Sequence, residues 1–142
     1  MQHVFVYGTL LFTGIVHGLT GRNFESEPAT LVNYQRKLVS NRDYPAIVEA
    51  PGEQVSGRLL LNVDARSLEI LRFYEGEDYD CQTLYVQIKN RDIKAWVFVW
   101  NGGAEALTEQ DWNANVFEKQ DLPDYIKYVI PDTVAEFTRL FS

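Results

Sequence analysis

Runs of apolar residues along the chain predict five β-strands. The run His3–Tyr7 is β-branched and aromatic almost throughout and is followed by a glycine, which is typical of a buried strand. A weaker pattern of the same kind covers Thr30–Val39, and Gln54–Val63 is a clear strand. Tyr79–Ile88 and Lys94–Trp100 flank the polar residues 89–92, so we expect these two strands to form a hairpin.

Turn-forming residues separate these strands. Three glycines between residues 14 and 21 predict a segment that is mostly loop, with at most a short helix. Residues 41–44 have the composition of a turn. Pro51–Gly52 predicts another turn, immediately before the strand that begins at residue 54.

Two parts of the chain predict helices. Asp64 is suited to cap a helix over residues 65–74 or 65–75. The stretch 108–141 has helical pieces, which Pro123 and Pro131 should interrupt. Together these elements predict one α+β domain over residues 1–142, with a mixed or largely antiparallel sheet. Such a sheet can curl into a barrel, but the pattern by itself does not fix the closure.

The composition fits a globular domain and excludes nucleic-acid binding. Of the 142 residues, 46% are hydrophobic, which is enough for a sizeable core. The formal net charge is −7, and no basic stripe exists that would neutralise phosphates. We therefore expect no nucleic-acid partner.

Cysteine usage and the N-terminal segment bear on location. Cys81 is the single cysteine, so no internal disulfide can form, which fits a reducing compartment. The first residues have no basic segment, and their apolar run is too short for a signal peptide or a membrane span. We expect a cytoplasmic protein without a membrane partner.

Metal sites and catalytic triads are not favoured. The chain has only His3 and His17 beside its one cysteine, too few for a His/Cys metal site. A Ser-His-Asp or Cys-His arrangement would need one of these histidines, of which His3 has a structural position in a strand and His17 an exposed one. We therefore expect no metal and no cofactor.

Glu75 is the most informative residue for catalysis. Leu68, Leu71 and Glu75 are spaced i, i+3 and i+7 on the predicted helix and so share one face. If the leucines point into the core, Glu75 points inward too, and lost hydration raises the pKa of its carboxyl toward a useful general-base value. The alternative is that the helix ends before Glu75, which is then an ordinary turn residue preceding a glycine.

The end of the first strand is a second candidate site. Gly8 follows the buried strand directly, so the backbone there can approach a ligand closely, and successive free N–H groups can bind an anion. Thr9 adds a hydroxyl group. A plain turn after the strand is the alternative.

Four ordered segments resemble the gamma-glutamylcyclotransferase-like family, which includes the plant AIG2-like proteins and gamma-glutamylamine cyclotransferases. The resemblance begins with Val6–Leu11 and continues through Tyr44–Ile47 and Val55–Leu60. It is strongest in Leu71–Tyr79, where the family pattern is a Leu-Asp pair, two further residues, Glu-Gly and a following tyrosine. The C-terminal third of the chain is less diagnostic.

The resemblance implies a mixed, mostly antiparallel β-barrel flanked by helices. It also implies a cavity between the end of the first strand and the helix that carries the acid. Tyr7, Gly8, Thr9 and Leu10 fall on the loop that binds the gamma-glutamyl part of the substrate, largely through backbone groups. Glu75 falls on the catalytic glutamate of the family.

Two departures from the family pattern bear on the substrate. The common Leu-Asp pair is Leu71-Arg72 here, so an aspartate near the acid is absent. Cys81 stands where many members have an arginine, so a charge partner is also absent.

The activity that the resemblance implies is conversion of a gamma-glutamyl amine or peptide to 5-oxoproline and a free amine, with Glu75 as general acid and base. The partner is then a small gamma-glutamyl substrate. Two alternatives remain at this point: an acyl- or amide-cleaving enzyme with another substrate, and a non-catalytic binding or stress-response protein of the same fold. The leaving amine and the oligomeric state stay open.

Overall fold

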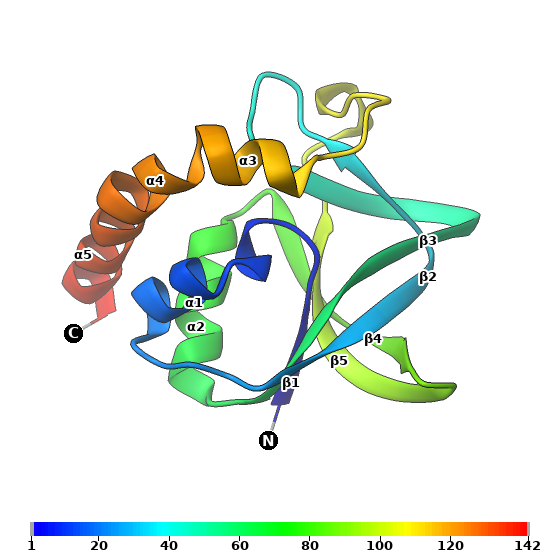
Figure 1. Cartoon of the computed structure of the whole chain (residues 1–142), viewed down its shortest axis with the longest axis horizontal. Coiled ribbons are helices and arrows are strands. Elements are labelled where there is room, and N and C mark those ends of the chain that lie inside the picture. Colours follow the sequence, from blue (N-terminus) through cyan, green and yellow to red (C-terminus); the bar gives the residue numbers. More distant parts are fainter. Residues whose placement is uncertain (1, 142) are drawn as a thin grey trace.

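The computed structural model describes residues 2–141, which form one α+β domain built on a five-stranded barrel (Figure 1). The strands are β1 (Gln2–Val6), β2 (Ser26–Leu38), β3 (Pro45–Val63), β4 (Tyr79–Ile88) and β5 (Arg91–Trp100). They pair in the order β1-β3-β2-β4-β5. All pairs are antiparallel except β1 with β5, which is parallel, so the predicted mixed, mostly antiparallel barrel is confirmed. The seam between β2 and β4 is thin, with Thr30 opposite Gln87 as its registered pair.

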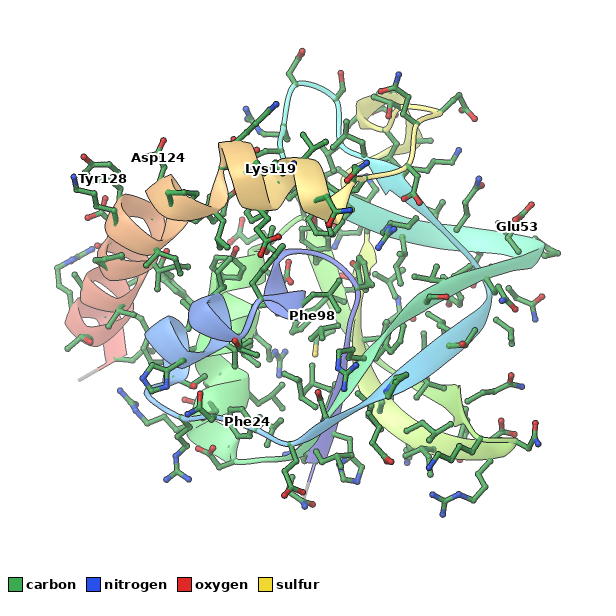
Figure 2. The ribbon with its side chains drawn as sticks, viewed as in Figure 1. Phe24, Glu53, Phe98, Lys119, Asp124 and Tyr128 are labelled. Carbon is green, nitrogen blue, oxygen red and sulfur yellow. The ribbon has the colours of Figure 1, made fainter. Side chains whose placement is uncertain are left out.

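The α-helices lie on one side of this barrel (Figure 1). The elements are η1 (Thr9–Leu11), α1 (Thr13–Thr20), α2 (Ala65–Glu75), η2 (Ala104–Ala106), α3 (Ala114–Gln120), α4 (Leu122–Asp124), the π-helical turn η3 (Tyr125–Val129) and α5 (Ile130–Phe141). In Figure 1, α1 and α2 lie next to the barrel, and α3, α4 and α5 form an arc along their outer side. Lys119, Asp124 and Tyr128 are labelled along this arc in Figure 2.

The first strand is buried on both faces, because it lies between the barrel interior and the helices. Phe5 and Tyr7 belong to the apolar cluster that fills the barrel. Val4 and Val6 point the other way, into a second cluster that packs against the helices. Alternation of side chains along a strand produces this division, and burial on both sides explains why the run reads as continuously apolar.

Helix α2 matches the prediction and sets the direction of Glu75. The Asp64 carboxylate accepts a hydrogen bond from the backbone N–H of Ser67 at 3.1 Å, which is the expected N-cap. Leu68 and Leu71 are buried on the inner face of the helix. The helix continues to Glu75, so the carboxylate lies in register with these leucines.

The predicted turn at Pro51–Gly52 is wrong, because these residues lie inside the long strand β3. Val32 pairs with Gln54 and Tyr34 with Glu49, so the single residue Asn33 faces residues 50–53 in a wide bulge. Gly52 has a φ of +87° and donates its N–H to the Asn33 side chain at 3.1 Å. The turn signal therefore produces a bulge, because β2 continues to pair on both sides of it.

The β4–β5 hairpin is confirmed, but its turn is tighter than predicted. Lys89 and Asn90 both have positive φ, as in a two-residue hairpin loop. Strand β5 therefore begins at Arg91, three residues before the predicted start.

Pro131 does not interrupt the C-terminal helical segment, contrary to the prediction. Pro131 lies in the first turn of α5, directly after the π-helical turn 125–129. A proline lacks the N–H for a normal helical bond and its ring clashes with the carbonyl four residues earlier. The wider π turn before Pro131 accommodates the missing N–H and the proline ring, so the chain continues as a helix.

The glycine-punctuated segment is more regular than expected, because residues 13–20 form the helix α1. Among residues 2–141, no helix is both long and apolar enough to cross a membrane.

Candidate active site

A cavity of about 220 Å³ lies where the end of β1 meets the helices. Residues 5–10 form one wall, and Tyr44 and Pro45 form a second. The C-terminal end of α2 contributes Tyr74 and Glu75, and the last helical segment contributes residues 125, 129 and 133. Phe98, which also lines the cavity, is labelled near the centre of the molecule in Figure 2. The cavity therefore contains all five residues that the sequence singled out.

The Glu75 carboxylate is enclosed by protein and has no partner. It makes no hydrogen bond or ion pair with any residue between 2 and 141. The residue keeps some accessible surface because it lines the cavity, and the surrounding atoms remove most of its other hydration. Burial accordingly raises the pKa of Glu75 to about 8. A carboxyl with this pKa can both accept and donate a proton near neutral pH.

Residues at the end of β1 that line the same cavity have backbone N–H groups without a partner among the described residues. The short helix η1 uses the carbonyls of Gly8 and Thr9 to accept from Leu11 and Phe12, at 2.9 Å and 3.2 Å. The N–H groups of Gly8, Thr9 and Leu10 precede the first donors of this helix and have no partner among the described residues. Successive free N–H groups of this kind can bind a carboxylate or an oxyanion.

The side chains of this loop are occupied within the protein. The Tyr7 hydroxyl donates to the Phe98 carbonyl at 2.5 Å, and burial together with the Glu75 charge raises the pKa of Tyr7. The Thr9 hydroxyl lies 2.7 Å from the Tyr74 hydroxyl. Leu10 packs in the core between barrel and helices. The loop therefore offers its main chain to a ligand.

Gly8 has a steric reason to be glycine. A Cβ at this position would lie 2.7 Å from Cγ of Pro45 and 2.9 Å from Cδ. Because a proline ring cannot rotate away, a larger residue would push the loop and Pro45 apart. The close approach of these two segments sets one side of the cavity.

Arg36 holds the same loop from outside. Its Nη1 donates to the Tyr7 carbonyl at 2.8 Å, while its Nε and Nη2 donate to the Asp111 carboxylate at 2.7 Å and 3.1 Å. The guanidinium also lies over the ring of Trp112, 5.4 Å from its centroid. This forked arrangement positions the end of β1 relative to the chain around residue 111.

Four tyrosines of the cavity were not assigned roles from the sequence. The Tyr79 hydroxyl donates to the Pro45 carbonyl, and the Tyr125 hydroxyl to the Asp43 carboxylate, both at 2.7 Å. Tyr74 pairs with Thr9, as described above. The Tyr44 hydroxyl has no hydrogen-bond partner within residues 2–141, so it is free to bind a ligand.

The sequence pointed to three of these tyrosines but not to the fourth. Tyr44, Tyr74 and Tyr79 lie within the segments that carry the family resemblance, which was the available sign of a role. Tyr125 and its neighbours on the last helix gave no signal, because their place in the cavity depends on long-range packing.

The two histidines do not line the cavity, and His17 is exposed as predicted. His3 accepts a hydrogen bond from the Asn62 backbone N–H at 3.1 Å. No three His, Cys, Asp or Glu side chains gather into a possible metal site in the described part of the chain.

Comparison with known families agrees with this geometry. Residues 4–114 match the model of the family "Gamma-glutamyl cyclotransferase, AIG2-like". The chain belongs to this family. The family includes gamma-glutamylcyclotransferases, and the match covers Glu75 and the loop 7–10 but ends before the last helical segment.

Individual relatives extend over most of the chain. AIG2-like protein D of Arabidopsis thaliana is 26% identical over 130 residues, which cover 89% of this chain and 86% of the relative. The solution structure of an Arabidopsis thaliana protein is 26% identical, with a TM-score of 0.68, and the match covers 90% of this chain and 87% of that one. A structure titled gamma-glutamyl cyclotransferase shares the fold, with a TM-score of 0.56 at 13% identity over 95% of this chain and 98% of the other.

Proposed function

We propose that this protein is a gamma-glutamylcyclotransferase that releases 5-oxoproline and a free amine from a gamma-glutamyl amine or peptide. The observation that carries the proposal is the unpartnered carboxylate of Glu75 in the same small cavity as the free N–H groups of residues 8–10. Membership of the family supports the same reaction class.

The reaction is an intramolecular aminolysis. The substrate carries an α-ammonium group and a γ-amide, and attack of the amine on its own γ-carbonyl closes a five-membered lactam. Ring closure is favoured because nucleophile and electrophile belong to one molecule, so that the enzyme has only to fold the substrate into an attacking geometry. No water is consumed, and the products are 5-oxoproline and the amine of the cleaved amide.

Glu75 moves the proton in this scheme. Its carboxylate removes a proton from the α-ammonium, and the amine nitrogen then bonds to the γ-carbon to give a tetrahedral oxyanion. The neutral carboxyl returns the proton to the amide nitrogen as the carbon–nitrogen bond breaks. The ring nitrogen then loses its second proton to the regenerated carboxylate, which passes it to the released amine, so the products are the neutral lactam and an ammonium ion. A pKa of about 8 suits both steps, since neither form of the group is strongly favoured near neutral pH.

The loop after β1 binds the anionic part. Its free N–H groups at residues 8–10 are donors for the substrate α-carboxylate or for the developing oxyanion. The raised pKa values of Tyr7, Tyr74 and Tyr79, which result mainly from burial, keep these phenols neutral around the reaction. Tyr44 offers one further hydroxyl to the substrate.

A non-catalytic binding role is the weaker proposal. That role would be supported if the Glu75 side chain were fully exposed, or if it formed an ion pair away from any cavity. The residue instead lines the cavity and has no counter-ion among the described residues. We therefore favour the catalytic role.

The test is release of 5-oxoproline from glutathione, gamma-glutamyl dipeptides and gamma-glutamyl-lysine. We expect turnover of at least one class, and we expect Glu75→Gln to lower kcat by about 100-fold or more while substrate still binds. Asp78→Asn is the matched control, because Asp78 is an exposed acid three residues away that does not line this cavity. If the Glu75→Gln variant kept most of the wild-type rate, Glu75 would not be the base.

A further inference from the structure

A second hollow adjoins the catalytic cavity, and its residues differ in character. It has a volume of about 560 Å³ and lies between α2, the start of β4 and the end of α5. We call it the aromatic groove and define it by Phe73, Phe137 and Phe141, together with Arg72 and Cys81. Figure 1 shows α2 and α5 on the same side of the barrel.

The groove begins where the catalytic cavity ends. Tyr79 and Phe98 line both hollows, so the two hollows share a border. Along the last helical segment, residues 125, 129 and 133 line the cavity and residues 137 and 141 line the groove, at steps of four residues. Side chains at this spacing share one helix face, so the two hollows follow each other along it. On α2, Glu75 lines the cavity and Arg72 the groove.

The catalytic cavity is too small for a large substrate. Its volume of about 220 Å³ lies below the roughly 300–1,000 Å³ that is usual for drug-sized ligands. A gamma-glutamyl group is compact and suits a space of this kind. A bulky leaving amine must therefore extend beyond the cavity, and the groove is the adjoining hollow.

The lining of the groove points to the chemistry of this amine. Phe73 and Phe137 pack with ring centroids 5.5 Å apart, and Phe141 completes the cluster at 6.0 Å from Phe73 and 4.9 Å from Phe137. Aromatic walls of this kind bind an apolar or aromatic group. Because Cys81 is small, it leaves room that an arginine at the same position would occupy.

Arg72 supplies an unused positive charge. Its guanidinium makes no hydrogen bond, ion pair or ring contact within residues 2–141. It nevertheless lowers the pKa of the Cys81 thiol, against the larger effect of burial, so it lies close to this residue at the groove. Glu69 and Glu77 are exposed residues of the same hollow. A carboxylate on the ligand would give Arg72 its missing partner.

We propose that the aromatic groove binds the leaving amine, and that this amine is an amino acid with an aromatic or large apolar side chain whose carboxylate pairs with Arg72. The proposal rests on the proposed cyclotransferase function. It also accounts for the two family departures, Arg72 and Cys81, which lie together in one groove. Glu69 and Glu77 would disfavour a leaving amino acid with an additional acidic side chain.

Four substrates separate the contributions of ring and carboxylate. Gamma-glutamyl-phenylalanine has both, the gamma-glutamyl amide of phenethylamine has the ring alone, gamma-glutamyl-alanine has the carboxylate alone, and gamma-glutamyl-methylamide has neither. We expect kcat/KM to be highest for the phenylalanine compound, with each feature contributing about fivefold. Equal values for the four compounds would overturn the groove proposal but leave the cyclotransferase proposal standing.

Variants of the groove give matched controls. Arg72→Gln should reduce the preference for phenylalanine over phenethylamine to near one, whereas Arg91→Gln, which removes an exposed arginine from the distant hairpin, should keep it. Cys81→Met should narrow the groove and reduce the preference for phenylalanine over alanine. Preferences that survive in both groove variants would contradict the assignment.

A binding measurement tests the groove proposal even if no reaction is observed. If neither these four compounds nor glutathione and gamma-glutamyl-lysine released 5-oxoproline, the proposed function would fall. The groove would then still be tested by titrating gamma-glutamyl-phenylalanine into the Glu75→Gln variant, with Arg72 intact or replaced by Gln. We expect affinity to fall about fivefold when Arg72 is replaced. Unchanged affinity, or no binding at all, would overturn the proposal.

Discussion

The hydroxyl of Thr9 lies 2.7 Å from the hydroxyl of Tyr74, although 65 residues separate them in the sequence. Thr9 belongs to the loop that presents free N–H groups, and Tyr74 immediately precedes Glu75 on α2. This one hydrogen bond therefore joins the proposed anion-binding loop to the helix that carries the proposed acid. It helps to fix the distance between the two halves of the site.

Removing this bond should reduce activity more than it reduces stability. We expect Tyr74→Phe to cost about 1–2 kcal/mol of unfolding free energy, because one hydroxyl loses its partner. The loosened loop should lower kcat/KM by about tenfold, since small errors in position are costly for catalysis. Thr9→Val should have similar effects, and the double variant should be little worse than either single one. Fully additive losses in kcat/KM would show that the two hydroxyls act independently.

Gly8→Ala tests the close contact with Pro45. The new Cβ would lie 2.7 Å from the proline ring, so the loop must move away from the cavity wall. We expect kcat/KM to fall by up to about 100-fold, with the folded structure retained by circular dichroism. Combining it with Pro45→Ala, which removes the colliding atoms, should restore part of the activity. An alanine variant with wild-type kinetics would mean that this contact does not position the loop.

The pH dependence of kcat/KM should report Glu75. The ionised carboxylate is the proposed base, and burial raises the pKa of Glu75 to about 8. Activity should therefore rise about tenfold per pH unit between about pH 6 and pH 7 and level off above about pH 8. A profile that is already flat in the acidic range would show that the reacting group has an ordinary carboxyl pKa.

The same buried acid should make the stability of the protein depend on pH. Its pKa is about 8 in the folded protein and near the ordinary 4.5 when unfolded. Below this lower value the group is neutral in both states and has no effect on folding. As pH rises toward the folded-state value the unfolded state ionises first, so stability falls, by up to about 5 kcal/mol in total.

Glu75→Gln isolates this contribution. We expect the variant to be more stable than the wild type near pH 8, the folded-state pKa of Glu75, and nearly as stable as the wild type near pH 4.5, the unfolded-state pKa. Urea denaturation at both pH values measures the difference in unfolding free energy. The Asp78→Asn control should show no such difference, because Asp78 is exposed. If Glu75→Gln destabilised the protein equally at both pH values, the carboxyl would not be desolvated as described. A site that costs stability in this way is expected where a group is kept for chemistry.

Local signals made α2 and its acid predictable from the sequence. The cap at Asp64 and the spacing of Leu68, Leu71 and Glu75 act within one helix, so no other part of the chain has to be known. The strands were found for a similar reason, because burial on both faces leaves a continuous apolar run such as residues 3–7. The closure of the barrel came from the family resemblance rather than from the pattern.

What the sequence did not predict depends on contacts between distant elements. Pro51–Gly52 forms a bulge because β2 pairs with β3 on both sides of it. Helix α1 tolerates Gly18 because that position packs against α5, where a Cβ would lie 2.8 Å from Cγ2 of Ile130. The free hydroxyl of Tyr44 and the share of the last helix in the cavity follow from the same long-range packing.

The site has two parts, one in the region shared with the family and one on the arc of C-terminal helices, and the second can change by itself. The proposed base and the N–H loop lie within the region shared with the family, while residues 125, 129 and 133, on one side of the last helical segment, lie beyond it. Substitutions along that one side can reshape the cavity without touching the groups that move the proton. Residues 137 and 141 on the same side line the aromatic groove, so under the proposed function descendants of one ancestral protein can exchange one leaving amine for another while the proposed ring-closing groups stay unchanged.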